Sequence, residues 1–218
     1  MNIKALTGLA ALAIGVSSVR ASVVYEVSSG PGNDFYQGFK EFGDELHLAG
    51  TDRVIESFSF DFFANYAQTG GMTFRIYAND GATVSGSKTP GTVLDVRTID
   101  VTEGGGHVKI DFPFDAANVL PDTITYTVTF SGIGAGSPNR AGLILPNATP
   151  SVGNSFDDIW QRTGTGASDW ALIQVTDPSG VPVIANFRAT VTAVPEPGTI
   201  ALMALGGAGL CIARRRRA

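Results

Sequence analysis

The chain has 218 residues, of which 16 % are charged and 27 are glycine. Roughly 25 % charged residues is usual for a soluble protein, so this composition disfavours a helical bundle or an acidic disordered chain and favours β-structure with many tight turns. Residues 22–194 carry nine Lys or Arg against nineteen Asp or Glu, a net charge of −10. An acidic body is repelled by phosphate backbones, so no nucleic-acid partner is expected.

The first 21 residues have the three parts of a secretory signal peptide. Lys4 supplies positive charge, residues 5–16 form an apolar run, and Val19-Arg20-Ala21 places a small residue at the expected cleavage site. The apolar run has no polar stripe at helical spacing, which argues against the alternative of an amphipathic first helix. We therefore expect cleavage after Ala21 and export of the remaining chain.

A second processing segment is predicted at residues 195–218. Pro195-Glu196-Pro197 should stop the preceding strand, because proline lacks an amide donor. Thr199–Ala213 follows as a short, uncharged, hydrophobic helix of about 22 Å, which is less than the roughly 30 Å of a hydrocarbon core and makes a poor permanent anchor. A membrane stop comes next. It is formed by Arg214, Arg215, Arg216 and Arg217 and would keep this end of the chain in the cytoplasm.

This order of Pro-Glu-Pro, short apolar segment and Arg cluster resembles the PEP-CTERM protein-sorting signal of Gram-negative bacteria that secrete exopolysaccharide. The resemblance implies that a membrane protease, exosortase, recognises Pro195, Glu196 and Pro197 and removes the tail. It also implies transient anchoring in the inner membrane through Thr199–Ala213, and then a place at the cell surface or outside the cell. An ordinary tail anchor is the alternative, and it leaves Pro-Glu-Pro unexplained.

Residues 22–194 are predicted to form one all-β domain. Residues 123–130 alternate Thr with apolar side chains, and residues 57–62 alternate Ser or Asp with Phe; both patterns are typical of strands with one buried face. The only cysteine, Cys211, lies in the tail, so a core without disulfides must stabilise this domain. Further strands are expected at residues 23–27, 45–48, 72–78, 93–99, 107–112, 142–145, 170–175 and 183–191.

About ten short strands separated by turn residues indicate a two-sheet β-sandwich or jelly roll. Turns are predicted at Gly70-Gly71 and at Gly104–Gly106, the second as a hairpin turn because the Lys and helix of a phosphate loop are missing. Residues 42–50, 57–62 and 74–81 also resemble the N-terminal half of sandwich domains found on PEP-CTERM proteins. That second resemblance supports the fold and implies no activity.

The sequence offers few parts for catalysis. His47 and His107 are the only histidines, both are expected on exposed strand faces, and neither lies in a Gly-x-Ser-x-Gly setting. No His-Glu-x-x-His motif or Cys cluster is available for zinc. We therefore expect a non-enzymatic protein without a cofactor. A structural calcium ion with unassigned ligands would be compatible with the acidic loop pairs Asn33-Asp34, Asp44-Glu45, Asn79-Asp80 and Asp157-Asp158.

Three functions remain open. The first is an exported, non-enzymatic surface or matrix protein that is sorted by its tail. The second is a carbohydrate-binding module associated with exopolysaccharide, in which Trp160 and Trp170 stack on sugars. The third is a hydrolase acting on polysaccharide, for which Asp157-Asp158 and Asp169, each beside a tryptophan, would supply the paired carboxylates.

Overall fold

The computed structural model describes residues 20–28, 34–67, 69–101, 106–115, 118–134, 136–166, 169–177 and 179–196. Within these ranges every regular element is a strand, so the prediction of an all-β sandwich is confirmed. None of the described residues belongs to a helix long and apolar enough to cross a membrane. Residues Ala21–Glu196 form a compact unit. Most of the predicted signal peptide, Pro197, the apolar segment Thr199–Ala213 and the Arg cluster lie outside the described residues.

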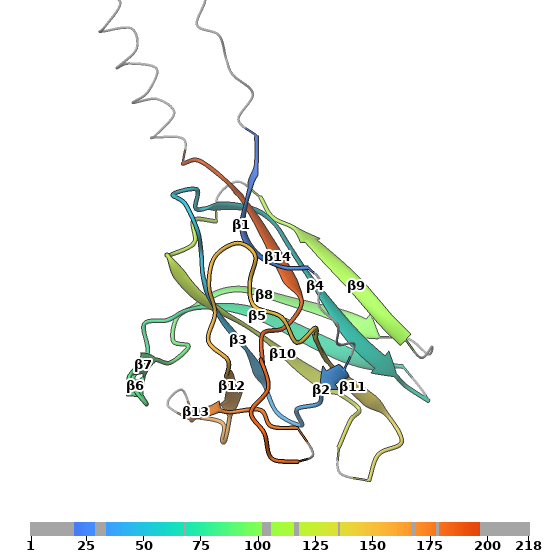
Figure 1. Cartoon of the computed structure of the whole chain (residues 1–218). Helices are drawn as coiled ribbons and strands as arrows, with labels where there is room; N and C mark the ends of the chain where they lie inside the picture. The colour runs from blue at the N-terminus through green and yellow to red at the C-terminus, as the bar shows by residue number, and fades with distance from the viewer. Residues whose placement is uncertain are drawn as a thin grey trace, which may run out of the picture. The chain divides into compact units, whose positions relative to one another are not determined.

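The first sheet is built around one long strand, β4 (Figure 1). Strand β9 runs along one edge of β4, while β14 and β11 follow each other along its other edge. Strand β1 pairs with β14, β2 pairs with β11, and all of these pairings are antiparallel. The six strands are β1 (Ser22–Val27), β2 (Asp34–Tyr36), β4 (Val54–Asn65), β9 (Gly106–Pro113), β11 (Arg140–Leu145) and β14 (Ala189–Val194).

The second sheet has the order β13-β12-β3-β10-β5-β8 and is also antiparallel. A separate two-stranded ribbon, β6 with β7, lies beside it. The strands are β3 (Phe42–His47), β5 (Gly70–Ala78), β6 (Thr83–Val84), β7 (Ser87–Lys88), β8 (Val93–Val101), β10 (Thr123–Ser131), β12 (Ile159–Arg162) and β13 (Trp170–Ile173).

Alternating side chains from the two sheets meet in one aromatic core. Phe58, Phe60 and Phe62 of β4 all point inward, as their spacing predicts, and each is at most 1 % exposed. The Phe60 ring stacks on Phe74 of β5 with centroids 5.3 Å apart, and Tyr126 of β10 packs against both rings. Such rings bury large apolar areas, which lets a domain without cysteine residues fold on its core alone.

The predicted turn at Gly70-Gly71 is wrong, because both residues begin β5. A side chain cannot fit at Gly70, where a Cβ atom would lie 2.0 Å from the Tyr66 ring, so glycine permits close packing here rather than a turn. Gly104 and Gly105, at the second predicted turn, lie outside the described residues, and Gly106 begins β9. Strands β8 and β9 on either side belong to different sheets, so they do not pair as the two arms of a hairpin.

The strand predicted at residues 183–191 begins only at Ala189 and runs to Val194. The preceding amides bind separate partners: the Phe187 amide donates to the Asp44 carboxylate of the second sheet, and the Arg188 amide donates to the Ile144 carbonyl of the first. Because this segment hydrogen-bonds to both sheets, it does not pair continuously with one strand and remains irregular. Four short strands, β2, β6, β7 and β12, were not predicted, because none is long enough to show alternation.

Candidate functional site

The described chain leaves the sandwich directly at the end of β14. Ala193 pairs with Ile55, and Val194, the last strand residue, pairs with Val54. Pro195 then ends the strand, as its missing amide predicts, and is half-buried, whereas Glu196 is exposed. Two of the three predicted sorting residues therefore follow the last strand of the folded domain without a linker.

Strand β1 lies beside this exit. Ser22, the residue after the predicted signal-peptide cleavage site, pairs with Ala193, and its hydroxyl donates to the Asp52 carboxylate at 2.6 Å. The two ends of the described domain, Arg20 and Glu196, therefore emerge from the same end of the sandwich (Figure 1).

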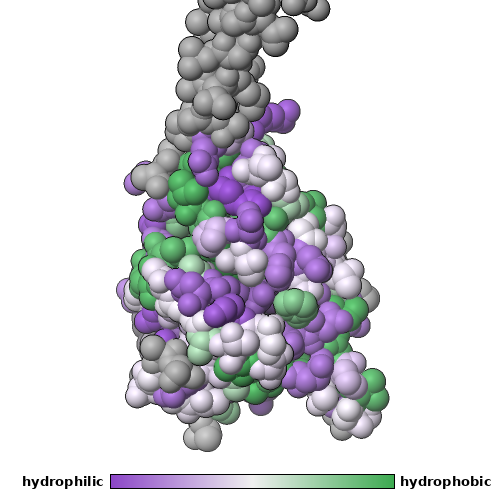
Figure 2. Space-filling model, turned by 90° about the vertical axis from the view of Figure 1, so that its left-hand side faces the viewer, coloured by the Kyte–Doolittle hydropathy of each residue, from purple (hydrophilic) through white to green (hydrophobic). Residues whose placement is uncertain are grey.

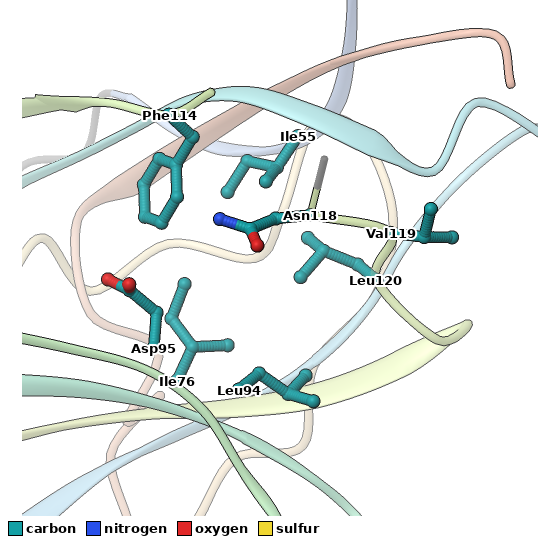
Figure 3. A pocket seen from close by; sticks show the side chains of 8 residues that line it. All are labelled: Ile55, Ile76, Leu94, Asp95, Phe114, Asn118, Val119 and Leu120. Carbon is teal, nitrogen blue, oxygen red and sulfur yellow. The ribbon is translucent and has the colours of Figure 1, made fainter. Parts of the chain in front are cut away.

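A cavity of about 290 Å³ lies between the two sheets near the start of β4 (Figure 3). Ile55, the strand partner of Ala193, lines it, and the Ile55 amide donates to the Asn118 carbonyl at 3.0 Å. Val119 bridges Val54 and stands at the rim, 50 % exposed. The complete lining is Ile55, Ile76, Leu94, Asp95, Phe114, Asn118, Val119 and Leu120.

Six of the eight residues that line this cavity are apolar, and Asp95 and Asn118 add polar groups. Asp95 is its only carboxylate, and the Arg97 guanidinium pairs with that carboxylate at 2.8 Å. The same guanidinium lies over the Phe114 ring, 4.9 Å from the centroid. Because Arg97 of the same strand compensates the negative charge of Asp95, the cavity suits an uncharged group better than a cation.

A family model described as the PEP-CTERM protein-sorting motif matches residues 193–217. The chain carries a PEP-CTERM sorting motif. The motif supports an exported protein that passes through the membrane and is processed by exosortase, as the sequence predicts. Its match begins at Ala193, so the PEP-CTERM motif overlaps the last two residues of the sandwich. No curated protein and no solved structure matches the chain.

Both predicted sugar-stacking residues are buried. Trp160 is 0 % and Trp170 is 4 % exposed, in a small second core on the outer face of the second sheet that also contains Tyr77. Tyr77 meets the edge of Trp170 with centroids 5.8 Å apart, and the Arg162 guanidinium covers a face of Trp170 at 4.8 Å. With their faces occupied, these two indole rings cannot stack on a sugar in this structure.

A buried polar network surrounds that second core. Glu41 accepts hydrogen bonds from the Tyr77 hydroxyl at 2.6 Å and the Thr127 hydroxyl at 2.7 Å, and it pairs with Arg162 at 3.1 Å. Burial, followed by the hydrogen bond and negative charge of Glu41, raises the pKa of Tyr77 to about 12. The network ties the residue before β3 to β5, β10 and β12, and its contacts identify a structural role rather than an open site.

The acids considered for calcium fall into different settings. Asp44 points into the core and is fully buried, whereas Glu45 lies on the opposite face of β3 and accepts a hydrogen bond from the Trp160 indole at 3.0 Å. Burial, then the charges of Glu45 and Asp157, raises the pKa of Asp158 to about 6. The described residues contain no group of three or more His, Cys, Asp or Glu side chains arranged to hold a metal ion.

The remaining predicted residues are also separate. Asp80, before the β6–β7 ribbon, accepts a hydrogen bond from the Thr92 hydroxyl after it, and Asp169 accepts the Gly166 amide at 2.6 Å within the loop before β13. His107 is exposed on β9, as predicted, while His47 is partly exposed and lies 3.1 Å from the Glu45 carboxylate. The second residue of the pair Asn33-Asp34 begins β2, and its first lies outside the described residues.

Sequence reasoning missed an open cleft between the end of β2 and the end of β12. It has a volume of about 420 Å³ and includes Phe39, whose side chain is 56 % exposed, and Lys40. The Tyr36 hydroxyl donates to Gln161 across it at 2.6 Å. An isolated Phe in a loop gives no periodic signal, so only its exposure in the fold identifies it. Elsewhere, apolar residues are dispersed in small areas over the face displayed in Figure 2.

Proposed function

We propose that this protein is a non-enzymatic surface or matrix component, exported by its signal peptide, held briefly in the inner membrane through Thr199–Ala213, and released by exosortase. The observation that carries the proposal is the matched PEP-CTERM motif, which starts in the last strand of a compact β-domain. The non-enzymatic assignment rests on the sequence, which has two histidines and no cysteine in residues 22–194. An exopolysaccharide surrounding is part of the proposal and follows from the resemblance of the tail.

The test is the mass of the mature protein in the producing bacterium. Replacing Pro195, Glu196 and Pro197 together by Ala should block tail removal and leave residues 22–194 folded, because neither Pro195 nor Glu196 belongs to the hydrophobic core that the described residues form. Replacing Arg214–Arg217 by Ala should instead let the uncut precursor slip outward, since positive charge holds that end in the cytoplasm. A wild-type surface protein that keeps Arg214–Arg217 would refute exosortase processing.

The exposed Phe39 favours a second candidate, a carbohydrate-binding role at a place other than the tryptophans. An aromatic ring, two amide side chains and Lys40 can together supply a stacking face and hydrogen bonds for sugar hydroxyls. Affinity electrophoresis in gels containing the host polysaccharide tests this candidate. Phe39→Ala should abolish retardation, while Phe156→Ala, at a Phe that is 43 % exposed elsewhere, should not. Unretarded wild-type protein would remove this candidate.

A further inference from the structure

We propose that the folded domain carries a second docking site for exosortase, formed by Val119 and the mouth of the cavity beside β14. The inference rests on the proposed function and deepens it. The sorting enzyme would read Pro-Glu-Pro and, at the same time, insert an apolar side chain of its own at this rim. Sorting would then depend on a folded domain as well as on the tail.

The motif and the cavity share one strand. At its first two residues, β4 binds Ala193 and Val194 along one edge, and along the other edge it binds the segment Asn118–Val119. Neighbouring strands are about 4.8 Å apart, so Val119 lies two such spacings, about 10 Å, from Val194. The start of the recognised motif and the rim of the cavity are therefore on one continuous surface.

The position of Pro195 brings an enzyme that binds the motif close to this surface. Val194 is still paired with Val54 when the motif begins, so no linker separates the recognition element from the domain. Val194 and Glu196 each precede a proline, which favours an extended backbone. An enzyme that holds this extended segment approaches to within a few residues of β14, and Val119 lies only about 10 Å from Val194.

The rim has the chemistry of a docking site for an apolar group. Val119 is 50 % exposed, and behind it Ile55 of the first sheet and Ile76 and Leu94 of the second line the cavity of about 290 Å³, beside the Asn118 side chain (Figure 3). Asp95, the charged residue in the lining, is paired with Arg97 at 2.8 Å. A small apolar side chain can enter such a space without leaving a charge unpaired, and its burial is favourable.

Charged substitutions at two matched valines provide the first test. Val119 bridges β4 at Val54, and Val108, which is 40 % exposed, pairs with β4 at Phe62, roughly 26 Å further along the strand. Val119→Asp in the full chain should slow tail removal about tenfold in a pulse–chase experiment, because one buried apolar side chain contributes about that factor in affinity. Val108→Asp should be processed at the wild-type rate.

Cross-linking provides a readout that does not depend on the stability of the variants. With Cys211→Ser as the background, Val119→Cys and Val108→Cys each give a chain with one thiol for a photoactivatable cross-linker. In membranes that contain exosortase, the precursor with Cys at position 119 should cross-link to the enzyme, and the precursor with Cys at position 108 should not.

The two proposals fail in different ways. Wild-type processing of Val119→Asp together with no cross-link from position 119 would overturn the docking site and leave exosortase processing intact. Unchanged processing after replacement of Pro195, Glu196 and Pro197 would overturn exosortase processing itself. A cross-link from position 119 combined with slow processing of Val119→Asp, but not of Val108→Asp, supports the second site.

Discussion

Asp44 is a carboxyl group placed inside the hydrophobic core. On β3 it faces inward between Phe42 and Leu46, and it is 0 % exposed. The Ser155 hydroxyl donates to one of its oxygens at 2.7 Å, and the Phe187 amide donates to the other at 3.3 Å. Burial raises the pKa of Asp44 well above its ordinary value of 3.8, against the opposing effect of these two hydrogen bonds.

This burial predicts that Asp44 lowers stability as the pH rises. Above pH 3.8 the unfolded chain releases the proton that the folded protein keeps on Asp44, so the free energy of unfolding falls with pH until the folded group titrates. Asp44→Asn imitates the protonated acid and should remove this part of the slope. Urea unfolding between pH 4 and 8 measures it, with Asp111→Asn, at an exposed position on β9, as the control. An unchanged slope in Asp44→Asn would contradict the prediction.

The two tryptophans differ in one hydrogen bond. The Trp160 indole donates to Glu45 at 3.0 Å, whereas the buried Trp170 indole nitrogen has no hydrogen-bond partner among the described residues. Trp160→Phe should therefore cost about 1–3 kcal/mol more stability than Trp170→Phe, because it leaves a buried carboxylate without its donor. Chemical denaturation of both variants gives the comparison, and equal losses would show that this bond contributes nothing.

The same residues show how far the sequence can predict a site. Trp160 and Trp170 attracted attention because aromatic rings beside acids suit sugars, but the sequence could not tell which face each ring would present. Their burial depends on Tyr77, a residue distant in sequence that packs against them across the outer face of the sheet. The sorting residues were predictable because their order along the chain is itself the signal.

Strands with a long alternating pattern of polar and apolar residues could be predicted from the sequence, but the residues that pack against their faces could not. The pattern of residues 123–130 predicted β10 to within one residue. It also suggested that the threonines face solvent, yet Thr125 and Thr127 are 0 % exposed. Their hydroxyls donate to Asn79 and Glu41, at 2.8 and 2.7 Å, so a polar layer covers this face. Alternation in the sequence predicts which residues of a strand share a face, but it does not predict what packs against that face.

The close approach of β3 to β10 leads to a prediction about a glycine. A Cβ atom on Gly43 would lie 1.8 Å from the Tyr126 carbonyl oxygen, which is backbone and cannot rotate away. Gly43→Ala should therefore destabilise the domain by about 3 kcal/mol. Gly134→Ala, where no heavy atom lies within 4 Å of the added Cβ atom, should change stability by less than about 0.5 kcal/mol. Thermal unfolding distinguishes the two, and equal melting temperatures would refute the steric argument.

For the whole molecule, the class of fold was predictable and the order of strands was not. Composition and turn spacing indicated a sandwich, but the pairing of β1 with β14 joins residues as distant as Ser22 and Ala193. No local pattern encodes such a pairing, because it depends on how both sheets close around the same core. Its consequence is functional, since it brings the predicted signal-peptide junction and the sorting motif to one end of the domain.

Because β1 pairs with β14, we predict that the domain requires β1 in order to fold and does not require residues 1–21 or 197–218. A chain of residues 22–196 should fold cooperatively, because residues Ala21–Glu196 form a compact unit. Removing β1 to leave residues 28–196 deletes Val24, Tyr25 and Val27, which are at most 2 % exposed. Burial of each such side chain contributes about 1.5–3 kcal/mol, so their combined loss is comparable to the roughly 5–15 kcal/mol of a whole domain.

The shortened chain 28–196 should therefore lack a cooperative thermal transition and show the far-ultraviolet circular dichroism of an unfolded protein, while 22–196 shows a β-sheet spectrum. Val23→Ala in the longer chain is the control, because Val23 is 41 % exposed and its truncation should shift the melting temperature little. If both chains unfold cooperatively at the same temperature, β1 only covers the edge of β14 and the domain is stable without it. The expected loss of cooperative folding would show that β14 depends on β1, the strand that follows the predicted signal-peptide cleavage site. Strand β14 in turn carries the first residues of the sorting motif.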